Sequence, residues 1–269
     1  MQKIGIHSVP RSGSSWLAQI FNSAPHVVVK FQPLFSYAFK NYLNENSTCE
    51  DISNFFAQIS LSDDAFINQS QQRDIGIYPT FKKDKNLTHI IYKEVRYHHI
   101  IKNLLMKDKE IILFGLIRNP FAVINSWLNT PREFRKDLGW SEEQEWLFAT
   151  AKNENKIEEF FGFNKWMEVA LMFEELAAIY PERFYITQYS NLLADTHTEI
   201  KKMFNFARIP MEQTTVDFIQ ASRNKNDNNK YSVYKQRAMD ENWKNELSPT
   251  IILGIEKILA TKTQLLKYL

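Results

Sequence analysis

Short apolar runs alternate along this chain with segments in which apolar residues recur every three or four positions. The runs are typical of buried strands, and the wider spacing is typical of helices that pack on one face. The runs predict strands over residues 3–9, 27–31, 88–95, 110–117 and 183–189. The wider spacing predicts helices over residues 15–22, 98–107, 121–128, 163–179 and 196–206.

Because strands alternate with helices, we expect a mostly parallel central sheet with helices on both faces. No repeat, linker or low-complexity tract divides the 269 residues, so the sequence predicts a single α/β domain over 1–269. Ligands of such folds bind beyond the carboxyl ends of the strands. Two loops rich in polar residues follow the strands over 3–9 and 110–117, and these loops are the candidate site.

The composition narrows the class of protein. Hydrophobic residues make up 44% and charged residues 24% of the chain, as in ordinary globular proteins. The net charge is only +2, which argues against a nucleic-acid partner. A single cysteine, Cys49, cannot form an intramolecular disulfide and fits a reducing compartment. The longest apolar run, 111–117, is too short for a membrane span, and no signal-peptide core follows Met1, so we expect a cytoplasmic protein.

The first loop reads PRSGSSW over residues 10–16 and joins a predicted strand to a predicted helix. Glycine allows close backbone approach to an anion, and a helix start presents free N–H groups and a positive dipole end. The loop is not a Walker A sequence, because the Gly-Lys-Ser/Thr ending is missing. Serines that merely cap the helix are the alternative interpretation. The predicted phosphate ligands are Arg11, Ser12, Gly13, Ser14 and Ser15.

The second loop reads LIRNPFAVINSW over residues 116–127. Asn119 and Pro120 are typical of a capped helix start. A cap does not explain Arg118, which ends an apolar strand and must be paired or face a ligand. Ser126 lies about two turns into the helix, so it meets a second anion together with Arg118 only if the helix packs back over the strand.

Together, the two loops resemble those of sulfotransferases that use 3′-phosphoadenosine 5′-phosphosulfate (PAPS). The first loop is similar to their 5′-phosphosulfate loop and the second to their 3′-phosphate motif, in a style closest to the carbohydrate sulfotransferases. The resemblance extends from residue 3 to about 248, with gaps at 35–87 and 129–162. It implies a P-loop-like sulfotransferase fold in which segment 223–244 closes over the nucleotide.

The resemblance also implies a cofactor and residue roles. PAPS would be the donor and adenosine 3′,5′-bisphosphate (PAP) the product, without a metal. Arg11 would stabilise the leaving oxygen, and Arg118 with Ser126 would hold the 3′-phosphate. The aromatic and closing-segment residues implied near the nucleotide are Trp16, Tyr189, Tyr231 and Lys235.

The catalytic base is not implied directly. Several carbohydrate relatives have a glutamate where this chain has Gln32, which cannot accept a proton. The predicted strand 88–95 ends at the same rim, so we expect Lys93 to contact the transferring group and Glu94 to act as base. A surface charge pair is the alternative for Glu94, and His99 is a further candidate base. No metal site is expected, because no His, Cys or carboxylate cluster has ligand spacing.

The two unmatched segments, 35–87 and 129–162, would form the acceptor pocket and lid. Residues 133–159 contain eight acidic and four basic side chains. Such a surface repels polyanions, so we expect a neutral or cationic small-molecule or carbohydrate acceptor, sulfated on a hydroxyl or amine.

Two other functions fit parts of the sequence. A P-loop-type nucleotide kinase is one, although the Walker ending and a magnesium-binding aspartate are missing. The other is a nucleotide- or nucleic-acid-binding module without catalysis, supported by a basic stretch with interleaved tyrosines. The basic residues of this stretch are Arg223, Lys225, Lys230, Lys235 and Arg237.

Overall fold

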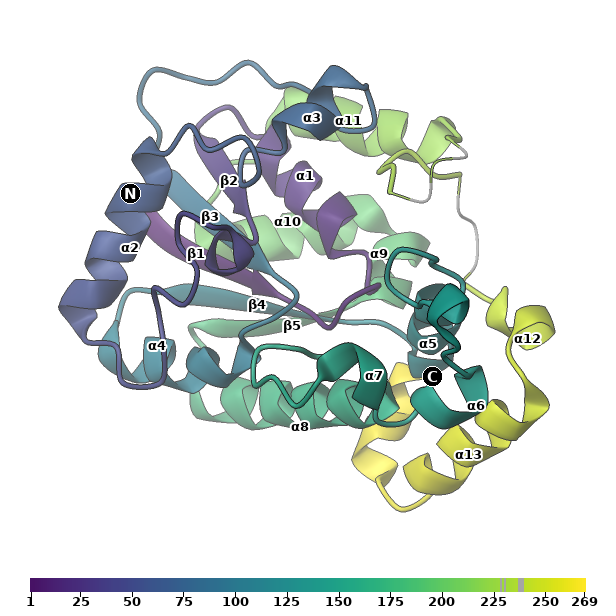
Figure 1. Ribbon diagram of the computed structural model, residues 1–269. Coiled ribbons are helices and arrows are strands. Elements are labelled where there is room, and N and C mark those ends of the chain that lie inside the picture. The colour runs from purple at the N-terminus through teal and green to yellow at the C-terminus, as the bar shows by residue number, and fades with distance from the viewer. Residues whose placement is uncertain (228, 230, 237–239) are drawn as a thin grey trace.

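The computed structural model describes residues 1–227, 229, 231–236 and 240–269, and its centre is a five-stranded sheet (Figure 1). All neighbouring strands are parallel, and their order is β2-β3-β1-β4-β5. The expected parallel α/β architecture is therefore confirmed. The strands are β1 (Gln2–His7), β2 (Val27–Phe31), β3 (His89–Glu94), β4 (Ile112–Ile117) and β5 (Phe184–Gln188).

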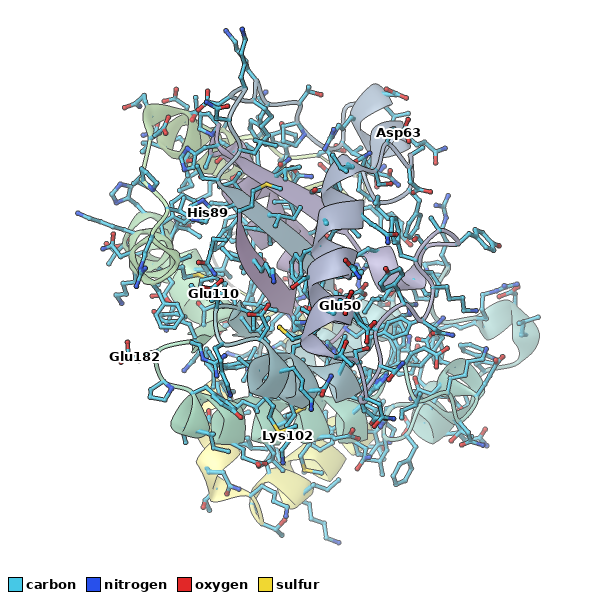
Figure 2. The ribbon with its side chains drawn as sticks, turned by 90° about the vertical axis from the view of Figure 1, so that its left-hand side faces the viewer. Glu50, Asp63, His89, Lys102, Glu110 and Glu182 are labelled. Atoms are coloured by element: carbon cyan, nitrogen blue, oxygen red, sulfur yellow. The ribbon has the colours of Figure 1, made fainter. Side chains whose placement is uncertain are left out.

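Helices cover both faces of this sheet (Figure 1). Successive side chains of a strand point to opposite faces of a sheet, so this sheet has an apolar cluster on each face. One cluster contains Ile4 and Ile6 of β1, and the other contains Ile90 and Tyr92 of β3. The Ile4 face is covered by α1 (Ser14–Ser23), α10 (Thr196–Ala207) and α11 (Gln213–Asn224). The other face is covered by α2 (Cys49–Leu61), α4 (Ile101–Lys107) and α8 (Phe163–Ile179), with α2 lying in front of the strands in Figure 2.

The predicted elements are all present, with ends within two residues of those expected, although the helix predicted over 98–107 starts as a 3-10 turn (His98–Ile100) before α4. Helix α2 was not predicted, although its sequence contains the features of a helix. A capping box at Thr48 starts it, and its inner face repeats at Ile52, Phe55, Phe56 and Ile59.

The remaining helices lie around the sheet and mostly toward its carboxyl edge. Helix α5 (Pro120–Leu128) follows β4 directly, and α9 (Tyr189–Ala194) follows β5. The others are α3 (Ser70–Asp74), α6 (Glu142–Glu145), α7 (Thr150–Asn153), α12 (Trp243–Glu246) and α13 (Pro249–Leu259), with 3-10 turns over Pro33–Phe35, Lys136–Leu138 and Thr263–Tyr268. Within the described ranges, none of the helices combines the length and apolarity that crossing a membrane requires.

Candidate active site

A cavity of about 790 Å³ opens at the carboxyl ends of the strands. Both polar loops line it, as do parts of segments 35–87, 129–162 and 223–235. Chain segments far apart in sequence thus meet at one place, as expected for this class of fold. The residues predicted from sequence that line the cavity are Arg11, Gly13, Ser14, Ser15, Trp16, Lys93, Arg118, Ser126, Tyr189, Tyr231 and Lys235.

Gly13 sets the shape of the first loop. Its φ of +89° lies in the left-handed region that favours glycine, and a Cβ at this position would lie 2.4 Å from the ring of Tyr189. Gly13 is also the N-cap residue just before α1, and its carbonyl accepts the N–H of Trp16 at 3.1 Å. The position therefore requires glycine for both its backbone angle and its contact.

The hydrogen-bonding groups of this loop are only partly satisfied within the described chain, where Nε of Arg11 donates to Ser126 and Ser15 is hydrogen-bonded to Tyr78. The N-cap residue of α1 is Gly13, and no side chain caps the helix. The described contacts therefore do not support the interpretation that the serines cap α1. The hydroxyl of Ser12 is buried without a hydrogen-bond partner among the described residues, which costs about 1–3 kcal/mol. Uncapped helix amides and an orphaned hydroxyl beside Arg11 fit an anionic group.

Arg118 joins the second loop to the first. Its Nη1 donates to the carbonyl oxygen of Arg11 at 2.6 Å, and its Nε donates to Asp240 at 2.7 Å. The second guanidinium nitrogen also pairs with Asp240. Burial lowers the pKa of Arg118, but the Asp240 carboxylate more than offsets this effect and the pKa is raised overall. The arginine is thus permanently charged.

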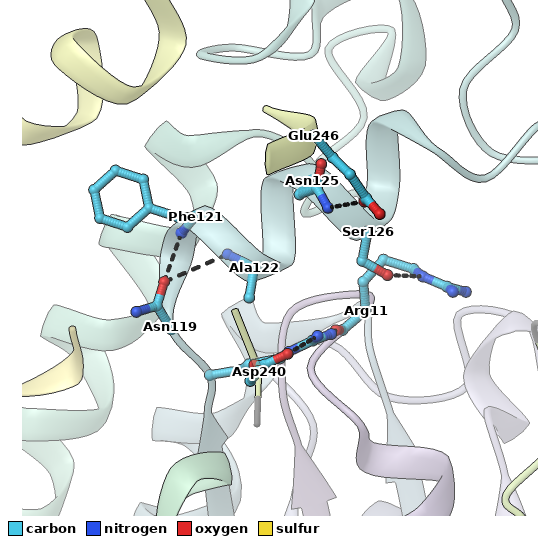
Figure 3. A network of polar contacts seen from close by, with 9 residues as sticks. Arg11, Asn119, Phe121, Ala122, Asn125, Ser126, Asp240 and Glu246 are labelled. Atoms are coloured by element: carbon cyan, nitrogen blue, oxygen red, sulfur yellow. Dashed lines mark hydrogen bonds and ion pairs between the residues drawn. The ribbon is translucent and has the colours of Figure 1, made fainter. Parts of the chain in front are cut away.

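Helix α5 starts just beyond the carboxyl end of β4 and packs against α8 and α12. Asn119 caps the helix by accepting the N–H of Phe121 at 3.0 Å (Figure 3). Two turns later, the hydroxyl of Ser126 accepts a hydrogen bond from Nε of Arg11 at 3.2 Å (Figure 3). Arg11, Arg118 and Ser126 are therefore linked directly in one cluster.

Lys93 and Glu94 are neighbours in β3 and point to opposite faces of the sheet. Lys93 lines the cavity, and burial lowers its pKa to about 8. Glu94 is fully buried on the other side, where it accepts the N–H of Leu34 at 2.9 Å, and burial raises its pKa to about 8. Neither Glu94 nor the half-buried His99 is among the residues that line the cavity. Three residues of segment 93–99 were predicted to act in catalysis: Lys93, Glu94 and His99. Of these three, only Lys93 lines the cavity.

Aromatic rings lie beside the two loops. The ring of Trp16 meets that of Tyr189 edge-on at 6.2 Å, and its Nε1 donates to Ser222 at 2.9 Å. The guanidinium of Arg118 lies 5.0 Å from the Tyr189 ring centre, and that of Arg11 lies 5.7 Å from the ring centre of Tyr231. These rings flank the charged cluster.

Two residues of the basic stretch near the C-terminus, Arg223 and Lys235, are hydrogen-bonded to main-chain carbonyls. Arg223 donates to the carbonyl of Leu193 at 2.9 Å, and Lys235 donates to that of Asn229 at 2.7 Å. Lys230 and Arg237 lie outside the described residues. The described members of the stretch are thus not arranged as an open basic stripe, which weakens the nucleic-acid-binding interpretation.

Three residues that line the cavity were not predicted as site residues from the sequence: Arg96, Arg132 and Glu133. Arg96 donates to Gln32 at 3.0 Å and pairs with Glu159 at 3.0 Å, so Gln32 orients an arginine here. Arg132 and Glu133 line the cavity from the segment after α5. Glu133 was counted only as part of an acidic run, and no local pattern marked it. Across the described residues, no His, Cys, Asp and Glu side chains are grouped to hold a metal ion.

Solved structures of known proteins share this fold. Mouse sulfotransferase SULT7A1, solved in complex with PAP, superposes with a TM-score of 0.54 at 14% identity, over 98% of this chain and 85% of that chain. The sulfotransferase domain from the curacin biosynthetic pathway has a TM-score of 0.53 at 18% identity, over 96% of each chain. Retinol dehydratase, solved with retinol and PAP, has a TM-score of 0.55 at 11% identity, over 98% of this chain and 81% of that chain.

No curated protein matches this chain in sequence. The family model described as the sulfotransferase domain, however, matches residues 2–267, nearly the whole length. The resemblance read from the two loops is therefore confirmed, and the chain belongs to the sulfotransferase domain family.

Proposed function

We propose that this protein transfers a sulfuryl group from PAPS to a hydroxyl or amine of a small-molecule or carbohydrate acceptor and leaves PAP. The single observation that carries the proposal is the link between the two loops. Arg118 donates to the Arg11 carbonyl, and Arg11 donates to Ser126, at the edge of one cavity. A nucleotide with phosphates at both its 5′ and 3′ positions fits two anion sites joined in this way.

Each end of the donor is assigned its own residues. The free amides at the start of α1, the orphaned Ser12 hydroxyl and the other serines of the loop would hold the 5′-phosphosulfate. Arg118 and Ser126 would hold the 3′-phosphate, and Trp16 with Tyr189 would flank the adenine. When bound, PAPS supplies a sulfuryl group activated by its bond to a phosphate.

The contribution of the protein is positioning and charge neutralisation, as in phosphoryl transfer. Arg11 cannot lose its proton at working pH, so its role is electrostatic. Lys93 is 3% exposed and remains mostly charged at neutral pH, because its lowered pKa of about 8 still lies above 7. A desolvated ammonium stabilises developing negative charge more strongly than a hydrated one.

The acceptor would enter between segments 35–87 and 129–162. Phe66 and Tyr78 from the first segment and Phe161 from the second give the cavity apolar walls. Arg96 and Arg132 add positive charge, so a neutral acceptor fits this lining better than a cationic one. A cytoplasmic location remains a prediction from the single cysteine.

Isothermal titration calorimetry tests the proposal with three probes: PAP, adenosine 5′-monophosphate, and ATP with magnesium. We expect PAP to bind far more tightly than the monophosphate, because only PAP reaches the 3′ site. Binding of ATP with magnesium but not of PAP would overturn the proposal in favour of a kinase. Binding of none of the three would also overturn it.

A further inference from the structure

Glu133 lies in the turn that follows α5, at the edge of the cavity. Its backbone is fixed at both polar groups: its N–H donates to the carbonyl of Thr130 at 2.9 Å, and its carbonyl accepts Nε1 of Trp127 at 3.3 Å. Trp127 is 1% exposed. The turn is thus anchored on the apolar core, and the carboxylate of Glu133 is held at the cavity by a rigid support.

The carboxylate lies beside the cations that serve the transfer. Its Oε1 is 3.7 Å from Nη1 of Arg11, and its charge shifts the pKa of Lys93 upward, opposing the effect of burial. Its other oxygen, Oε2, is buried and has no hydrogen-bond partner among the described residues. One oxygen of Glu133 is therefore oriented by Arg11, while the other keeps a lone pair free for a proton donor.

Two other carboxylates near this end of the sheet, those of Glu94 and Glu159, also have a buried Oε2 without a hydrogen-bond partner among the described residues. Glu94, however, points to the far face of β3 and accepts the N–H of Leu34, and Glu159 is paired with Arg96. Neither of them lines the cavity. Among the described residues that line the cavity, Glu133 is the only Asp or Glu. Gln32, at the position where several carbohydrate relatives have a glutamate, also lines the cavity but cannot accept a proton.

We propose that Glu133 is the general base of the transfer, an inference that rests on the proposed function. As the acceptor oxygen or nitrogen bonds to sulfur, its proton passes to the carboxylate of Glu133. The bond between sulfur and the phosphate oxygen breaks, and that oxygen leaves with the electron pair as part of PAP. Arg11, in contact with Glu133, stays charged throughout and orients the carboxylate without competing for the proton.

The test uses PAPS with water as the acceptor, and PAPS with an aliphatic alcohol whose hydroxyl stays protonated at neutral pH, so that it does not depend on the natural acceptor. PAP release is measured by chromatography for the wild type, Glu133→Gln and Glu133→Asp. We expect Glu133→Gln to lower PAP release by about a hundredfold. Glu133→Asp keeps a carboxylate and should release PAP at a rate between those of the wild type and Glu133→Gln.

Controls separate this inference from the proposed function and from misfolding. Glu256→Gln removes an exposed carboxylate of α13, outside both acceptor segments, and should release PAP at the wild-type rate. Calorimetry with PAP should give each variant an affinity within about threefold of the wild type if its fold is intact. Release by Glu133→Gln within about twofold of the wild type would overturn the base assignment alone. A wild type that binds PAP but releases none from PAPS would overturn the transfer and the base together.

Discussion

Arg118 and Asp240 form a two-pronged ion pair across 122 residues of sequence, with Nε donating to Oδ2 at 2.7 Å. Both side chains are largely buried, at 10% and 19% exposure. The segment that follows Asp240 is fastened to α5, because Asn125 donates to Glu246 at 2.6 Å. The guanidinium edge that we assign to the 3′-phosphate is thus held by a carboxylate, a planar anion with two acceptor oxygens.

Replacing Asp240 with Asn should tighten PAP binding by roughly tenfold, because the 3′-phosphate no longer competes with a carboxylate for Arg118. Calorimetry with PAP measures the change. Adenosine 5′-monophosphate is the matched ligand, and its affinity should not move. Weaker PAP binding by Asp240→Asn would mean instead that Asp240 holds Arg118 in position for the nucleotide.

Arg118→Ala should weaken PAP binding roughly ten- to a hundredfold, since it removes hydrogen bonds to a charged group. It should leave binding of adenosine 5′-monophosphate nearly unchanged. The same pair of titrations decides the outcome. Equal loss for both nucleotides would contradict the assignment of Arg118 to the 3′-phosphate.

Gly13→Ala should destabilise the protein by more than the backbone strain of about 1–2 kcal/mol, because its Cβ would lie 2.4 Å from Tyr189. The matched control is Gly139→Ala, where φ is also positive at +79° but no atom lies within 4 Å. Urea unfolding of both variants separates strain from contact. Equal destabilisation would show that the ring of Tyr189 moves aside at little cost.

The rate of PAP release should fall as pH rises through about 8, because Lys93 acts as a cation and its pKa is lowered to about 8 by burial. Lys93→Arg should remove this alkaline decline, since arginine stays charged. The pH profiles of the two proteins provide the check. An unchanged alkaline decline in the variant would assign it to another group.

Glu94 should make the folded protein less stable as pH rises. Its pKa is near its ordinary value of 4.5 in the unfolded chain and about 8 in the folded one, so the unfolded chain binds fewer protons between these values. The protonated Glu94 side chain makes its whole contribution to the free energy of unfolding below pH 4.5, and this contribution is lost as pH rises toward about 8.

Urea unfolding of Glu94→Gln across this pH range tests the effect. The amide keeps an oxygen for the Leu34 N–H but does not ionise, so the decline in stability should flatten. An unchanged decline would show that other groups cause it. A loss of PAP release of about a hundredfold in this variant would return the base role to Glu94.

The sequence alone determined the features that depend on short stretches of chain. The sheet follows from apolar runs such as 27–31, whose β-branched residues favour strands wherever the rest of the chain lies. The first loop could also be predicted from the sequence, because the turn at Gly13 and the start of α1 depend only on a few neighbouring residues. The Arg118 loop also contained its own cap, at Asn119.

Only the tertiary structure decided which charged groups share the cavity. Strand alternation separates Lys93 from Glu94, but the packing of β3 between β1 and β2 determines which of them faces the nucleotide loop. Glu133 pairs with Arg11, and Asp240 pairs with Arg118, across more than a hundred residues of sequence in each case. Such long-range contacts leave no local pattern, because a carboxylate in a loop has the same composition whether it faces solvent or a cavity.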